Sequence, residues 1–162
     1  MGKTTSLTEL GLTAQTGGEV RITGLTVDSR EVKPGFLFAA LPGSNIHGAE
    51  FIQYALRMEA GAILTDAEGA QIARDVLDGA DAALVITEDP RQALAGAAAL
   101  WFGRHPAHMI CVTGTNGKPS VAPVTRHIWI EMGYQTAHLS TTGIKGAYPE
   151  HIVQTPPAHV LR

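Results

Sequence analysis

The chain has 162 residues, of which 44% are hydrophobic and 17% are charged, and its formal net charge is −3. This composition is typical of a folding globular chain, and the length suffices for one domain or a small domain plus part of another. The mild negative charge argues against nucleic acid as a partner, and the sequence has no run of about 18 apolar residues that would span a membrane.

The only cysteine, Cys111, excludes an internal disulfide framework and fits a reducing compartment. It lies inside an apolar run, which favours a buried structural thiol over a reactive one. The first five residues, MGKTT, lead into no hydrophobic export segment. We therefore expect a cytoplasmic protein with no membrane partner.

The first hundred residues alternate short β-type runs with helical ones. Strands are expected at residues 20–27, 36–41, 61–65 and 82–87, and helices at residues 49–60, 67–77 and 91–102. Helical spacing places Ile52, Ala55 and Leu56 on one face of the first helix, and Leu94, Ala97, Ala98 and Trp101 on one stripe of the last. This alternation predicts an α/β fold with layered helices and a largely parallel sheet.

Residues 103–108 (GRHPAH) interrupt the last helix and mark the best domain boundary, so we expect one domain over residues 1–104 and a second over 105–162. The second should open with a strand at 109–113, a glycine-rich loop, a helix and a strand within 134–140, with turns after Gly143. Its helix carries Val121, Val124, Ile128 and Met132 at helical spacing. A βαβ unit of this size cannot bury both faces of its sheet. We therefore expect the second segment to be only the first part of a domain.

The glycine-rich loop is the most informative motif. It comprises Gly114, Thr115, Asn116, Gly117, Lys118, Pro119 and Ser120. Glycines let backbone N–H groups converge on phosphate oxygens, and a lysine adds a positive charge. The strict phosphate-loop pattern G-x-x-x-x-G-K-[ST] fails twice, because Val112 replaces its first glycine and Pro119 replaces the hydroxyl residue that would face Mg²⁺. Phosphate binding is favoured, with a plain glycine-rich turn as the alternative.

Two further segments could bind a ligand. TVDSR (residues 26–30) could present a hydroxyl and a guanidinium to a uridine or a phosphate, although a plain polar turn is the commoner use of these residues. LPGSNIHG (residues 41–48) is a loop whose N–H groups could hold a diphosphate or could simply connect two elements. His105 and His108 lack the further ligands that a metal site requires, so the sequence assigns no metal ligands.

Taken in order, these segments resemble the beginning of a Mur ligase, most closely the MurE type. The resemblance covers essentially the whole chain and is carried by residues 25–30, 34–40, 43–51 and 112–118, with weaker matches at 142–143 and 154–156. It implies an N-terminal domain that binds UDP-N-acetylmuramoyl dipeptide, followed by the first βαβ part of a P-loop-type ATP-binding domain. The implied reaction is an ATP- and Mg²⁺-dependent amide ligation of peptidoglycan synthesis, which adds meso-diaminopimelate or lysine as the third residue.

The resemblance also implies roles for individual residues, in a protein expected to be monomeric. The substrate would be contacted by Val27, Ser29, Ser44, Asn45, Ile46, Gln154 and Thr155. ATP would be held by Gly114, Thr115, Asn116, Gly117, Lys118, Pro119 and Ser120, with Lys118 as the catalytic residue on the phosphates.

Three prolines depart from the family pattern: Pro119, Pro123 and Pro157. Pro119 removes both a hydroxyl and a backbone N–H, and Pro123 removes a hydrogen bond from the following helix. The chain also stops well short of the family's length, before the region that selects the amino acid. We therefore expect it not to ligate by itself, and the alternatives are a non-catalytic UDP-sugar-binding module or a decayed or partial gene product.

Overall fold

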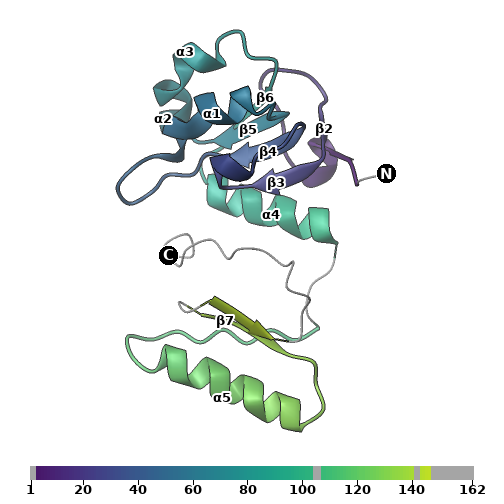
Figure 1. The fold of residues 1–162 in the computed structure, drawn as a ribbon, viewed down its shortest axis with the longest axis vertical. Helices are drawn as coiled ribbons and strands as arrows, with labels where there is room; N and C mark the ends of the chain where they lie inside the picture. Colours follow the sequence, from purple (N-terminus) through teal and green to yellow (C-terminus); the bar gives the residue numbers. More distant parts are fainter. Residues whose placement is uncertain (1–2, 104–106, 141–142, 147–162) are drawn as a thin grey trace. The chain divides into compact units, whose positions relative to one another are not determined.

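The computed structural model describes residues 3–103, 107–140 and 143–146 (Figure 1). The chain divides into two compact units, Met1–His105 and Pro106–Arg162, which we call unit 1 and unit 2 and describe separately. No helix within the described ranges is long and apolar enough to cross a membrane.

A four-stranded parallel sheet forms the centre of unit 1 (Figure 1). Its strands lie in the order β3 (Gly24–Thr26), β4 (Phe36–Ala39), β5 (Ala62–Thr65) and β6 (Ala83–Ile86). All three pairings are parallel, with Leu25 opposite Leu37, Phe38 opposite Ile63 and Leu64 opposite Val85. The expected α/β fold with a parallel sheet is confirmed.

The strand expected at residues 20–27 is two strands. β2 (Arg21–Ile22) pairs antiparallel with β1 (Thr5–Ser6), whereas β3 joins the parallel sheet. The break falls at Thr23, whose N–H donates to the Gly35 carbonyl at 3.0 Å and whose hydroxyl donates to the Pro34 carbonyl at 2.8 Å. These bonds to the turn before β4 redirect the chain between its two pairing partners.

The helices of unit 1 follow the expected order. The two expected at 49–60 and 67–77 are shorter than their patterns predict, whereas the one expected at 91–102 is found at Pro90–Phe102. The helical elements are the 3₁₀ turns η1 (Thr8–Leu10), η2 (Ser29–Glu31) and η3 (Gly48–Phe51), and the α-helices α1 (Ile52–Arg57), α2 (Ala67–Ile72), α3 (Arg74–Leu77) and α4 (Pro90–Phe102). The helix expected at 49–60 therefore opens as a 3₁₀ turn, and the one expected at 67–77 breaks at Ala73. Helix α4 is capped by Asp89 and ends at the left-handed Gly103 (φ 62°).

Both faces of the sheet are covered, α4 lying on one side and α1, α2 and α3 on the other (Figure 1). Side chains alternate between these layers along each strand. Leu37, Ala39 and Leu64 pack in the cluster that includes Ala97 of α4. Phe38 and Ile63 pack in the opposite cluster with residues of α1. The apolar runs of the sequence are continuous because most positions of the four strands are buried on one face or the other.

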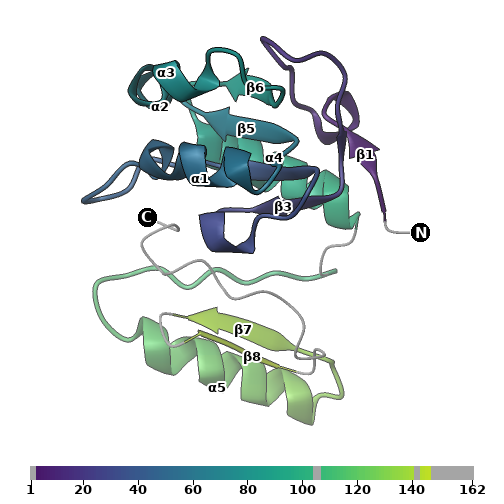
Figure 2. The same cartoon turned by 45° about the horizontal axis from the view of Figure 1, so that its top comes forward.

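Unit 2 contains α5 (Lys118–Glu131) and an antiparallel hairpin of β7 (Ala137–Ser140) and β8 (Gly143–Gly146), and α5 packs against β7 (Figure 2). The helix and a strand within residues 134–140 are confirmed. The expected βαβ unit is wrong, because the described sheet is an antiparallel pair of strands. Of the stretch expected to be turn-rich after Gly143, residues up to Gly146 form β8, and the rest lies outside the described residues.

The strand expected at residues 109–113 is also wrong, since these residues are not in a strand. A β-strand needs a neighbouring strand that accepts and donates its hydrogen bonds. The described part of unit 2 provides no such pairing partner for residues 109–113. Met109 and Ile110 are exposed (72% and 56%), and Cys111 is an exposed free thiol. The expected burial of Cys111 fails for the same reason, because the strand that would have buried it does not form.

Candidate functional site

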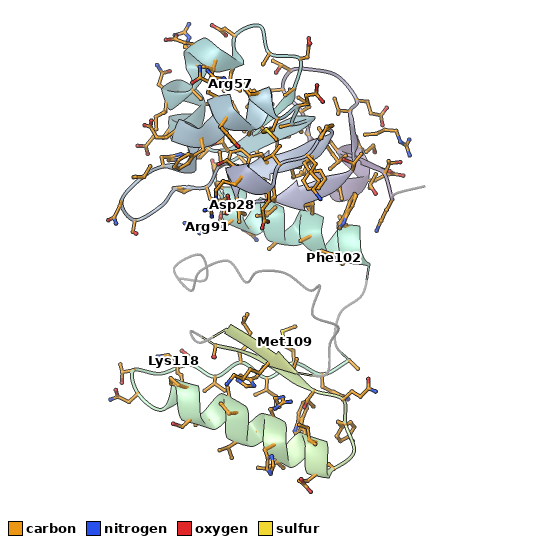
Figure 3. All side chains as sticks on the ribbon, in the orientation of Figure 1. Asp28, Arg57, Arg91, Phe102, Met109 and Lys118 are labelled. Carbon is orange, nitrogen blue, oxygen red and sulfur yellow. The ribbon has the colours of Figure 1, made fainter. Side chains whose placement is uncertain are left out.

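The candidate site lies at the edge of the unit 1 sheet where its strands end, which we call the carboxyl edge. All four strands run parallel, so the segments that follow them emerge together. They are the turn 27–31 after β3, the loop 41–48 after β4, Asp66 after β5 and Asp89 after β6. Loop 41–48 projects from this edge at the left of Figure 1, and Figure 3 shows Asp28 and Arg91 close by. Polar side chains from segments far apart in sequence are thereby collected in one place.

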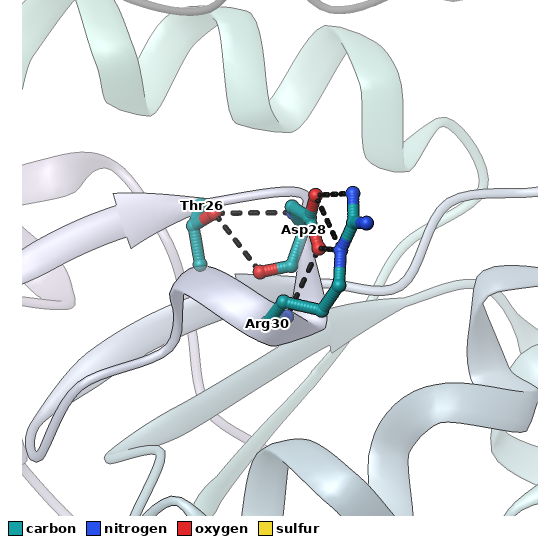
Figure 4. Close-up of polar contacts among 3 residues, drawn as sticks. All are labelled: Thr26, Asp28 and Arg30. Carbon is teal, nitrogen blue, oxygen red and sulfur yellow. Dashed lines mark hydrogen bonds and ion pairs between the residues drawn. The ribbon is translucent and has the colours of Figure 1, made fainter.

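The turn after β3 is held by Asp28 (Figure 4). Its carboxylate accepts hydrogen bonds from the Arg30 backbone N–H at 2.9 Å and from Arg30 Nε at 2.9 Å, and it pairs with the terminal guanidinium nitrogen. The Arg30 side-chain and backbone hydrogen bonds lower the pKa of Asp28 to about 2. The Arg30 side chain is nevertheless 82% exposed. The turn is therefore a stable polar cap that still presents a cation to solvent.

The residues expected to contact the substrate nucleotide lie in two of these segments. Val27 and Ser29 are half-buried at the end of β3, and Val27 packs against the cluster beneath α4. Ser44, Asn45 and Ile46 are exposed at the tip of loop 41–48, where Ile46 is 59% exposed. The fold thus brings both groups to the carboxyl edge.

Loop 41–48 is closed at its base. The Gly48 N–H donates to the Leu41 carbonyl at 2.8 Å, and the Arg91 guanidinium at the start of α4 donates to the Pro42 carbonyl. Position 43 requires glycine, because a Cβ there would lie 2.2 Å from the Ile46 carbonyl oxygen. The exposed tip is therefore a tight turn on a fixed base and not a loose connection.

Three polar residues of this edge were not singled out from the sequence: His47, Asp66 and Arg91. The His47 Nε2 atom lies 3.1 Å from Asp66 Oδ1, and its Nδ1 accepts a hydrogen bond from the Ala49 N–H at 3.0 Å. Asp66 also caps α2, accepting from the Gly69 N–H at 2.7 Å. An aspartate between a buried strand and a helix is a recognisable N-cap signal, but the sequence carries no signal that pairs it with His47.

The backbone of the glycine-rich loop of unit 2 turns at two glycines. Gly114 (φ 139°) and Gly117 (φ 80°) adopt positive φ, which glycine permits without strain. Lys118 is the first residue of α5, and its ammonium folds back to donate to the Gly114 carbonyl. The residues from Gly114 to Ser120 are exposed. The glycines and the lysine fit a phosphate group.

The same loop does not fit Mg²⁺. Pro119 is the second residue of α5, where its missing N–H breaks no helical bond, but it supplies no oxygen where a hydroxyl ligand would lie. Within the described ranges, no three His, Cys, Asp or Glu side chains are grouped to hold a metal ion. Gln154 and Thr155 lie outside the described residues.

Comparisons with known proteins agree on one family. The model of the "Mur ligase family, catalytic domain" matches residues 21–102, which is half of the chain. A UDP-N-acetylmuramoyl-L-alanyl-D-glutamate--2,6-diaminopimelate ligase of Brucella melitensis is 45% identical over 127 residues, which cover 78% of this chain and 25% of that protein. The ligase of the same name from Caulobacter vibrioides is 42% identical over 138 residues, covering 84% of this chain and 27% of that protein.

Among solved structures, MurF from Acinetobacter baumannii aligns over 60% of this chain and 21% of its own, with 18% identity and a TM-score of 0.47, too low to support any argument. The chain spans about a quarter of the length of the curated relatives it matches. The family match over half of the chain shows that it belongs to the Mur ligase family.

Proposed function

We propose that unit 1 binds the uridine diphosphate end of UDP-N-acetylmuramoyl-L-alanyl-D-glutamate at the carboxyl edge of its sheet. The observation that carries this proposal is the closed loop 41–48, which presents an exposed polar tip and follows β4, the strand paired with β3. The names of the curated relatives supply the substrate class. In open parallel sheets, ligands bind outside the carboxyl ends of the strands.

The chemistry of this edge suits a nucleoside diphosphate. Ser29, Ser44 and Asn45 offer hydroxyl and amide groups for the ribose and the base, and Ile46 offers apolar surface against the base. The exposed guanidinium of Arg30 supplies a positive charge for the diphosphate. These groups recognise sugar, base and phosphate separately, as a nucleotide site requires.

We further propose that residues 105–162 belong to the ATP-binding part of a cytoplasmic, monomeric ligase that adds the third residue of the peptidoglycan peptide. Gly114 to Lys118 would hold the phosphates of ATP, and ATP would supply the phosphoryl group that activates a substrate carboxylate. Lys118 would bind the phosphates by exchanging its hydrogen bond to the Gly114 carbonyl for one to a phosphate oxygen. The described residues do not fit Mg²⁺, so we assign no step to the metal in this polypeptide.

A non-catalytic UDP-sugar-binding module is the second candidate function. It is favoured by Pro119, which replaces the hydroxyl that the metal-bound nucleotide would require. Incubating the chain with ATP, Mg²⁺, UDP-N-acetylmuramoyl-L-alanyl-D-glutamate and diaminopimelate tests whether this polypeptide ligates by itself. We expect substrate binding without amide formation, and measurable amide formation would exclude the binding-module candidate.

Calorimetric titration of the 162-residue chain with the UDP-muramoyl dipeptide tests the binding proposal. We expect micromolar affinity in the absence of ATP. The double variant Ser44→Ala/Asn45→Ala should weaken binding about tenfold, because it removes two side-chain hydrogen-bonding groups. Gln71→Ala, an exposed change on α2, is the matched control and should leave affinity unchanged. Absence of binding by the unaltered chain would refute the proposal.

A further inference from the structure

We infer that His47 is a positioning residue, which holds the tip of loop 41–48 for the nucleotide through a bridge to Asp66. This inference rests on the proposed function, since it concerns how the nucleotide loop keeps its shape. His47 directly follows the exposed tip residues Ser44, Asn45 and Ile46, yet its own side chain is only 10% exposed. It is therefore the point at which the tip meets the folded body of unit 1.

The contacts of the ring define its tautomer. A backbone N–H can only donate, so the bond from Ala49 N–H to Nδ1 at 3.0 Å requires an unprotonated Nδ1. The proton of the neutral imidazole then lies on Nε2, which faces Asp66 Oδ1 at 3.1 Å and donates to it. Each ring nitrogen thus has one suitable partner, and the other neutral tautomer would satisfy neither contact.

The bridge ties together segments that follow two neighbouring strands. Nδ1 caps the turn η3 that follows the loop, and Nε2 reaches the carboxylate that caps α2 after β5. The ring packs closely on the first turn of α2, because a Cβ added at Gly69 would lie 2.6 Å from His47 Cε1. With the Gly48–Leu41 bond and the Arg91 contact to Pro42, the bridge is the third anchor of the loop. Its loss would release the C-terminal side of the tip.

The matched variants separate the two bonds of the ring. His47→Ala removes both, whereas His47→Asn keeps an oxygen that can accept from the Ala49 N–H but is too short to reach Asp66. We expect His47→Ala to weaken binding of the UDP-muramoyl dipeptide about tenfold, and His47→Asn to recover part of that loss. His127→Ala, which removes a histidine that is 75% exposed on α5, should leave affinity unchanged.

A second readout does not depend on ligand binding. Long-range ¹H–¹⁵N spectra of the unaltered chain should show His47 as the Nε2–H tautomer, and amide exchange at Ala49 should accelerate in His47→Ala but not in His47→Asn. Unchanged affinity in a folded His47→Ala variant, or the Nδ1–H tautomer in the spectra, would overturn the inference while leaving the proposed function standing. Absence of binding by the unaltered chain would instead remove the proposed function, and the nucleotide role of His47 with it.

Discussion

Helices α4 and α5 are of nearly equal length and each carries an apolar stripe, yet they have opposite environments. Ala97 of α4 is fully buried, and its neighbours Leu94 and Trp101 pack against the sheet of unit 1. On α5, by contrast, Val124 and Ile128 are 58% and 53% exposed. Among the described residues, every buried hydrophobic side chain belongs to unit 1, and unit 2 buries only Thr136.

The difference teaches that an amphipathic pattern identifies the face that can be covered but not what covers it. In unit 1 four strands present a continuous apolar surface to α4. In unit 2 the described sheet is a two-stranded hairpin, and α5 meets it while Val124 and Ile128 stay exposed. Since burial of apolar area supplies most of the folding free energy, we expect the stability of the chain to reside in unit 1.

The largest expected effect comes from truncating a core side chain of unit 1, compared with an exposed apolar side chain of unit 2. Phe38→Ala removes a ring that is 1% exposed between β4 and the α1 layer, and should lower the free energy of unfolding by about 3–5 kcal/mol. Ile128→Ala on α5 should change it by less than about 0.5 kcal/mol, because the side chain is already exposed. Urea denaturation of both variants checks this. A large loss at Ile128 would mean that α5 has a buried partner.

An intermediate effect is expected at two helical glycines of unit 1. A Cβ at Gly69 would lie 2.1 Å from Thr65 Oγ1, so Gly69→Ala should destabilise the chain by about 1–3 kcal/mol. Gly96 of α4 has nothing within 4 Å of an added Cβ, so Gly96→Ala should stabilise it by about 0.5–1 kcal/mol. Thermal unfolding of both variants checks whether their changes in stability have opposite signs. A neutral Gly69→Ala would show that α2 is free to move away from β5.

The smallest effects are those of pH, which should reach unit 2 first. Burial, followed by the charges of Arg126 and Lys145, lowers the pKa of His138 on β7 below its ordinary 6.5. A folded state that disfavours the charged ring loses stability as the pH falls below 6.5 and through the lowered pKa. Amide exchange in α5 and β7 should therefore accelerate between neutral and mildly acid pH, and His138→Gln should abolish this change.

Unit 1 should respond only at lower pH. Its Asp28 has a pKa of about 2 against an ordinary 3.8, so the contribution of the Arg30 pair is complete above about pH 4 and is lost as the pH falls towards 2. Because Arg30 is exposed to solvent, this contribution should stay below about 1 kcal/mol. Comparing Asp28→Asn with the unaltered chain in urea, across this range, measures it. If unit 1 lost stability at a higher pH than unit 2, this order would be wrong.

Sequence patterns were sufficient where a segment is apolar and bounded by strong turn signals. The runs around Leu37, Ile63 and Leu84 predicted parallel strands, and the apolar stripe within residues 91–102 predicted α4. They failed at Thr23, where hydrogen bonds to a distant turn split one run into two strands, and at residues 109–113, which lack a pairing partner. The second failure also placed Cys111 in a core where it does not lie.

The candidate site also has a part that the sequence predicted and a part that it did not. The family resemblance singled out Val27, Ser29, Ser44, Asn45 and Ile46, and the parallel sheet brings their segments to one edge. The His47–Asp66 bridge joins residues that are 19 positions apart. No local pattern encodes it, because it forms only when β4 and β5 pair in register and bring the ends of both strands together.

The sequence by itself determined the family of this protein, the α/β class and the glycine-rich loop of Lys118, because these depend on residue types at short fixed spacings. Only the tertiary structure decided which apolar stripe is buried and which carboxylate the ring of His47 contacts. Those outcomes depend on strand pairing between distant segments, and the free energy of a contact is decided by what the whole fold places opposite each side chain.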